Sequence, residues 1–169
     1  LFLGLFFSFS STSSVISEKM NKETYFFFKR HLAFVFIALF LLIIISVQEK
    51  NKIIKFILPI FSISILFLFL VSVIGVEIKG SKRWIDLFFI PRFQPIELVK
   101  PLFILFVAKI IVLNDKMNIY SRYLFSFFVL SIIVVLLINQ PDLGQTLLLI
   151  ASWIAMVFVS GFNMVVLTI

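Results

Sequence analysis

Of the 169 residues, 62% are hydrophobic and only 14% are charged, and the mean hydropathy is +1.21. A soluble domain has about 45–50% apolar residues, so this chain cannot cover its apolar surface with polar groups, and its solvent has to be lipid. Cysteine is absent and histidine occurs once, as His31, which excludes disulfides, zinc-thiolate sites and histidine metal clusters. The net charge of +7 lies in short loops between apolar runs, which favours contact with phospholipid headgroups or an anionic lipid over nucleic acid.

Long apolar runs predict membrane-spanning helices, because a helical span takes about 20 apolar residues. The runs cover about 1–16, 25–47, 53–76, 98–113, 123–139 and 143–160, and a seventh begins near 163. No strand-like alternation persists, and backbone groups in lipid must be satisfied within each segment. We therefore expect an all-α polytopic membrane protein that forms one integral membrane domain over 1–169. Because the sequence starts and stops inside apolar runs, we also expect it to be a piece of a longer protein.

Eight charged residues interrupt the apolar pattern between residues 77 and 100, where we expect a loop over about 77–97. Within GSKRWI (80–85), Lys82 and Arg83 are suited to clamping a phosphate group, and Trp84 suits the membrane interface. The alternative is an ordinary juxtamembrane loop whose basic residues touch lipid headgroups. Ionisable groups at membrane depth are candidates for function, and composition leaves both interpretations open.

The segment QPIELVKP (94–101) predicts a helix start at membrane depth. Proline is favoured at the first helical position, so Pro95 opens the helix, and Glu97 and Lys100 then share one face. The free N–H groups of a helix start suit an anion. Pro101 disfavours helix at Lys100, so we expect a broken or kinked helix that lines a cavity.

A second polar segment, INQPDLGQT (138–146), places Asp142 between two uncharged helices. Pro-Asp-x-Gly is a common turn, in which Asp142 would cap the following helix. Alternatively, an aspartate at the bilayer boundary needs a cation, for which Lys100 and Arg83 are the candidates on the same side, and we hypothesise a buried ion pair between Lys100 and Asp142.

Three segments in this order resemble the motifs of the SEDS family (shape, elongation, division and sporulation): GSKRWI (80–85), QPIELVK (94–100) and QPDLG (140–144). The family motifs read Gly-Ala-x-Arg-Trp-Ile, then Gln-Pro-Ser-Glu-x-x-Lys and, one helix hairpin later, Gln-Pro-Asp-x-Gly. Ser81 and Ile96 depart from the alanine and the serine of that pattern. The residues of these motifs are most similar to those of the cell-division members, and the elongation members are the close alternative. The resemblance covers the whole chain and implies the first six to seven helices of a roughly ten-helix bundle.

The resemblance implies a membrane glycosyltransferase that polymerises lipid II, an undecaprenyl-diphosphate-linked disaccharide pentapeptide, into septal glycan strands. Its implied place is the bacterial inner membrane at the division septum, and its implied partners are a class B penicillin-binding transpeptidase and other divisome proteins. The implied substrate cavity is lined by Lys82, Arg83, Trp84, Gln94, Glu97, Lys100 and Asp142.

The catalytic aspartate of the family lies in a His-Thr-Asp-Phe-like motif that residues 1–169 do not contain, so the catalytic base is unknown and Asp142 does not take that role. No cofactor or metal site is evident, although a divalent cation could assist the leaving diphosphate. Two other functions fit the same features: a lipid II flippase, which needs a cavity for the same lipid, and a non-catalytic divisome scaffold.

The distribution of basic residues and the family resemblance predict opposite orientations of the charged segment in the membrane. The side with loops 17–31 and 75–100 carries nine Lys and Arg, whereas the side with 48–55 and 109–122 carries six, so the positive-inside rule places the charged segment in the cytoplasm. The resemblance places it in the periplasm. Five of the nine basic residues lie in 79–100, where a diphosphate site needs positive charge in either orientation, so we follow the resemblance.

Overall fold

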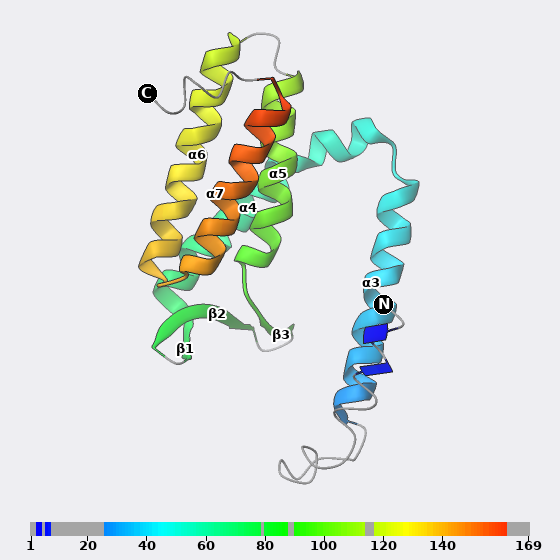
Figure 1. The fold of residues 1–169 in the computed structure, drawn as a ribbon. Helices are drawn as coiled ribbons and strands as arrows, with labels where there is room; N and C mark the ends of the chain where they lie inside the picture. The colour runs from blue at the N-terminus through cyan, green and yellow to red at the C-terminus, as the bar shows by residue number, and fades with distance from the viewer. Residues whose placement is uncertain are drawn as a thin grey trace. The chain divides into compact units, whose positions relative to one another are not determined.

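The computed structural model describes residues 3–4, 6–7, 26–78, 80–87, 90–113 and 117–161. In chain order the elements are α3 (Phe26–Val47), α4 (Lys50–Ile74), β1 (Val76–Ile78), β2 (Ser81–Leu87), β3 (Ile90–Phe93), α5 (Ile96–Leu113), α6 (Ile119–Asn139) and α7 (Leu143–Val159), as Figure 1 shows. The chain divides into two compact units, residues 1–50 and 51–169. The expected span from 163 onward lies outside the described residues, as does most of the span expected over 1–16.

The first unit contains α3, a helix of 22 residues. None of its described side chains is buried, although most of them are large and apolar. A helix that is apolar on all sides is suited to lipid rather than to water. At its polar start, the guanidinium of Arg30 lies 5.7 Å from the ring centre of Phe34, one turn further along.

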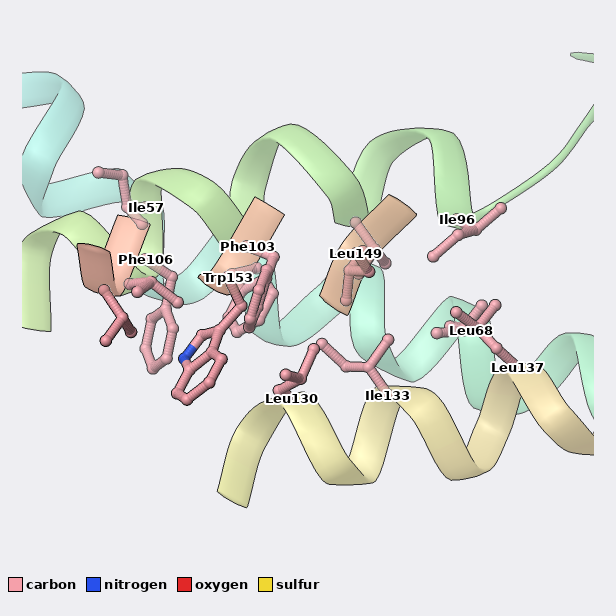
Figure 2. Close-up of a cluster of buried hydrophobic side chains, with 14 of the residues drawn as sticks. Ile57, Leu68, Ile96, Phe103, Phe106, Leu130, Ile133, Leu137, Leu149 and Trp153 are labelled. Atoms are coloured by element: carbon pink, nitrogen blue, oxygen red, sulfur yellow. The ribbon is translucent and has the colours of Figure 1, made fainter. Parts of the chain in front are cut away.

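The second unit buries one face of each of its four long helices. On α4 the buried residues recur at intervals of four and three: Ile57, Phe61, Ser64, Leu68 and Val71. The buried residues of α6 show the same alternation: Tyr123, Ser126, Leu130, Ile133 and Leu137. This spacing is typical of helices that pack along a narrow seam. Figure 2 shows labelled side chains from α4, α5, α6 and α7 meeting in this core.

Aromatic and hydroxyl side chains join the helices at the core. The rings of Phe61 and Phe106 stack with their centres 4.6 Å apart, which links α4 to α5. The indole N–H of Trp153 on α7 donates to the Ser126 hydroxyl on α6 at 3.0 Å. Ser126 donates in turn to a carbonyl of its own helix at 2.8 Å, so this buried hydroxyl is satisfied. Small, satisfied hydroxyl residues let helices approach closely in lipid.

The segment expected to be a loop, about 77–97, instead contains a three-stranded antiparallel sheet in the order β1-β2-β3. Gly80, at φ 79°, makes the turn between β1 and β2, a conformation that favours glycine. Arg92 on β3 pairs with Asp86 on β2 at 2.6 Å. Strands of three to seven residues are too short to show a persistent alternation, which is why the sequence did not reveal them.

Three helices begin before the apolar runs used to predict them, and one of these, α5, begins at Ile96 rather than near 98. Helix α4 begins at Lys50 rather than near 53 and ends at Ile74 rather than near 76, because β1 starts directly after Gly75. Helix α6 begins at Ile119 rather than near 123. An α-helix satisfies its backbone internally, so it can continue past the apolar segment into the polar interface.

Three helices of the described residues are long and apolar enough to cross a membrane by length and composition: Phe28–Val47, Lys50–Ile74 and Ile119–Asn139. Helix α5 has 18 residues but includes Glu97, Lys100 and Lys109, and α7 has 17 residues. The lipid-suited faces of these helices carry exposed residues such as Phe69 and Phe128. These features are those of a multi-pass membrane protein.

Candidate functional site

The turn between α6 and α7 is the centre of the candidate site. Gln140 ends α6, Pro141 cannot continue it with a backbone N–H, and Asp142 caps α7 by accepting from the N–H of Gln145 at 3.5 Å. Gln140 and Asp142 are 3% and 5% exposed, so this polar turn is buried. The Gln140 amide also donates to the carbonyl of Leu68 at 3.0 Å, which ties the turn to α4. The structure thus confirms that Asp142 caps the helix that follows it.

Arg83 reaches this turn from β2. Its Nε donates to the Gln140 carbonyl at 3.1 Å, one Nη donates to the Pro141 carbonyl, and the other lies 3.6 Å from Asp142 Oδ1. The last carbonyls of a helix lack partners within the helix and attract a cation. Arg83 therefore holds the sheet against the end of α6 while its charge is balanced by Asp142.

Gln94, just before α5, completes the surroundings of Asp142. Its amide donates to Asp142 Oδ2 at 3.1 Å. Asp142 then accepts hydrogen bonds from Gln94 and from the backbone N–H of Gln145, and it forms an ion pair with Arg83. A positive charge and two N–H donors face this position, so the site suits a carboxylate.

A second ion pair lies at the start of α5. Lys100 Nζ is 2.8 Å from Glu97 Oε2, and the two residues are three apart on one helix face. The other oxygen of Glu97, Oε1, accepts from the side-chain amide of Gln145 on α7 at 3.3 Å. Gln145 thereby connects both ion pairs, since its backbone N–H bonds Asp142. We call these six residues the polar network: Arg83, Gln94, Glu97, Lys100, Asp142 and Gln145.

The predicted Lys100–Asp142 ion pair is wrong. Asp142 pairs with Arg83, and Lys100 pairs with Glu97. Lys100 has an acidic neighbour one helical turn away on its own helix, whereas Asp142 is already surrounded by donors from β2 and the chain before α5.

Helix α5 is not broken at Pro101, because it runs as one helix through that residue; the alternative expectation, a kink at Pro101, stays a prediction. Pro95 lies directly before its first residue, as predicted for a helix start, and the carbonyl of Pro95 accepts from Leu98 and Val99. Ile96, which stands where the family has serine, is 1% exposed and belongs to the core. An apolar residue at that position is thus explained by packing.

Two of the predicted site residues lie on β2 outside the polar network. Lys82 is exposed, and its cross-strand neighbour is Glu77. Trp84 is half-buried and faces Val76 in the register. Within the described residues, no group of three or more His, Asp or Glu side chains is placed to hold a metal ion.

The sequence interpretation left out two polar residues of this turn: Gln145, which belongs to the polar network, and Gln140, which ties the turn to α4. Both lie in INQPDLGQT, at the junction of two apolar helices. A strongly polar amide at such a position needs partners in lipid, and this signal would have singled them out.

The model of the FtsW/RodA/SpoVE family of cell cycle proteins matches residues 1–169. The chain belongs to this family. This finding confirms the resemblance drawn from the three motifs. The probable peptidoglycan glycosyltransferase FtsW of Aliivibrio salmonicida is 32% identical over 154 residues, which are 90% of this chain and 38% of that protein. The FtsW of Buchnera aphidicola subsp. Acyrthosiphon pisum is 37% identical over 161 residues, with 89% and 38% covered.

Two solved structures share the fold of this chain. The rod shape determining protein RodA of Thermus thermophilus has a TM-score of 0.71 at 26% identity, over 95% of this chain and 54% of that one. A chain of a peptidoglycan synthase complex has a TM-score of 0.67 at 29% identity, over 79% and 39%. The match confirms the expected helical membrane fold. This family member spans 38% of the length of the two FtsW proteins named above.

Proposed function

We propose that this chain, extended to the full length of its relatives, is a peptidoglycan glycosyltransferase that polymerises lipid II during cell division. The observation that carries the proposal is the polar network. Three segments separated by up to about 60 residues converge on one another: Arg83 from β2, Glu97 and Lys100 from α5, and Asp142 from the α6–α7 turn. Such a concentration of charge in a lipid-facing protein favours a functional site over chance placement.

In the proposed reaction, a sugar hydroxyl of one lipid-linked disaccharide unit attacks the anomeric carbon of a second lipid-linked unit. A new C–O bond forms, the bond to the undecaprenyl diphosphate breaks with its electron pair, and a base takes the hydroxyl proton. We assign Lys82 and Arg83 to the departing diphosphate, because cations stabilise the charge that develops there. Lys100 supplies a further cation. The base belongs to the part of the family sequence that follows residue 169.

The proposed setting is the bacterial inner membrane at the division septum. The polar network and the three-stranded sheet face the periplasm, where lipid II headgroups are presented. The proposed partners are a class B penicillin-binding transpeptidase and further divisome proteins. A peptidoglycan synthase complex that shares this fold supports the first of these partners.

The proposal is tested by glycan polymerisation from fluorescent lipid II with the full-length protein and its transpeptidase partner. We expect Lys100→Ala to lower the initial rate about 100-fold or more, because it removes a cation from the site. Lys55→Ala is the matched control: Lys55 is an exposed lysine near the start of α4, outside the polar network, and its loss leaves the rate unchanged.

Polymer from the parent and the control but not from Lys100→Ala supports the glycosyltransferase. If a folded parent makes no polymer but moves lipid II across a liposome membrane, the glycosyltransferase is refuted and the flippase is supported. If the parent and Lys100→Ala complement a division defect equally and neither makes polymer, the scaffold is supported.

A further inference from the structure

Gln145 lies where the two ion pairs of the polar network meet. Its backbone N–H donates to Asp142 Oδ1 at 3.5 Å, and its side-chain Nε2 donates to Glu97 Oε1 at 3.3 Å. Lys100 holds the other oxygen of the same carboxylate at 2.8 Å. The Glu97 carboxylate is therefore held on both sides, by an amide from α7 and by an ammonium from α5.

The orientation of the Gln145 amide is determined by Glu97. A reversed amide would bring its oxygen against a carboxylate oxygen, so two acceptors would meet. The observed orientation leaves Gln145 Oε1 buried and without a hydrogen-bond partner among the described residues. A buried acceptor without a donor lowers stability, and a leucine of similar size would avoid that cost.

A residue that lowers stability where an apolar one would fit is typical of a functional position. Here the amide restrains Glu97, whose side chain is 54% exposed and is otherwise held by Lys100 of its own helix, and thereby restrains Lys100. We propose that Gln145 is a positioning residue: by holding Glu97 from α7, it sets the position of the Lys100 ammonium for the anionic headgroup of lipid II. This inference rests on the proposed function for its substrate, but the restraint itself does not.

The restraint is tested without substrate by thermal melting of the full-length protein in detergent. Gln145→Leu is compared in the parent and in a Glu97→Met background. In the parent, the leucine removes both the unpaired oxygen and the hydrogen bond to Glu97. In the Glu97→Met background, Gln145→Leu removes only an amide that has already lost its partner. We therefore expect Gln145→Leu to shift the melting temperature upward in the Glu97→Met background relative to its effect in the parent. Equal shifts in both backgrounds would overturn the proposal.

The positioning role is tested by the initial rate of polymerisation from fluorescent lipid II. We expect Gln145→Leu to lower the rate about tenfold, the loss for one hydrogen bond to a charged group. Gln48→Leu is the control, since the Gln48 amide is exposed and bonds only the carbonyl of Ile44 within its own segment.

A pH profile of Gln145→Glu separates positioning from packing. A carboxyl group donates to Glu97 only when protonated, so the rate relative to the parent should recover as the pH falls from about 7 toward about 5. The charged groups that face this position are Glu97 and Lys100 of α5, Asp142 at the start of α7, and Arg83 of β2. Gln145→Leu has no proton to regain and should show no recovery.

The outcomes are distinguishable. A parental rate for Gln145→Leu, or a Gln145→Glu profile parallel to the parent's, overturns the positioning role. A folded parent that makes no polymer refutes the glycosyltransferase instead, and the melting comparison then decides whether Gln145 restrains Glu97.

Discussion

Replacing Asp142 by asparagine tests whether the polar turn is held together by a carboxylate. Asp142 is 5% exposed, its side chain accepts from Gln94 and from the N–H of Gln145, and it forms an ion pair with Arg83. Asp142→Asn keeps the size of the side chain but turns one acceptor oxygen into an NH₂ donor. If the NH₂ group takes the place of Oδ1, it faces the donors of Arg83 and Gln145. If it takes the place of Oδ2, Gln94 has to turn its own amide to accept from it. In both orientations Arg83 loses its anion.

The magnitude follows from burial. An unpaired buried donor costs about 1–3 kcal/mol, and removing one partner of a buried ion pair costs about 3–5 kcal/mol. The Arg83 side chain is 30% exposed and keeps two backbone carbonyls as partners, which places the second contribution near its lower end. Because Gln94 can turn its amide, the lost anion of Arg83 dominates, and we therefore expect a loss of about 3–4 kcal/mol, or a fall in melting temperature of about 6–12 °C.

The assay is thermal melting of the full-length protein in detergent, followed by size-exclusion chromatography. Asp86→Asn is the matched control, because Asp86 pairs with Arg92 on the exposed sheet surface and its pair is worth about 0–1 kcal/mol. If the melting temperature of Asp142→Asn equals that of the parent or of Asp86→Asn, the carboxylate does not organise the turn. Only the interpretation of Asp142 as a helix cap then remains.

Two further substitutions test the packing that supports the site. Phe103→Ala, at a fully buried position of α5, should lower stability by about 3–5 kcal/mol because of the lost contacts and the cavity it leaves. Phe128→Ala, at a position 61% exposed on α6, should change stability by less than about 0.5 kcal/mol, and equal melting temperatures of the two variants would contradict the assigned core. Arg122→Met should lower stability by about 1–2 kcal/mol, because Arg122 donates to the carbonyl of Ile111 in the last turn of α5. The polymerisation rate at a permissive temperature should stay near that of the parent. Loss of polymerisation without loss of stability would assign Arg122 a role in the site.

The helices of this protein could be predicted from its sequence because the signal is local. Runs of apolar residues at least as long as a bilayer is thick require helices whatever surrounds them. The Gln-Pro and Pro-Asp dipeptides likewise mark the start of α5 and the turn before α7, since proline restricts its own backbone and that of its neighbour. The sheet between α4 and α5 could not be predicted, because its strands are short and are held by cross-strand pairing.

The candidate site was predicted as a set of residues but not as a set of pairs. The motifs singled out Arg83, Glu97, Lys100 and Asp142, which the structure brings into one polar network. The partner of Asp142 was predicted incorrectly, because that choice depends on where β2 places Arg83, 59 positions away in the chain. Gln145 was not considered, because it lies one residue beyond the Gln-Pro-Asp-x-Gly motif from which Asp142 was taken.

The sequence by itself determined the lipid solvent, the helical segments and the family, because these follow from composition, from the length of apolar runs and from short motifs read in order. Only the tertiary structure decided which charges pair, which amide joins the two ion pairs, and that Ile96 is a core residue rather than a site residue. The physical reason is distance. An ion pair or hydrogen bond forms only within a few ångströms, and for residues about 60 positions apart that separation is set by how β2, α5 and the α6–α7 turn pack together.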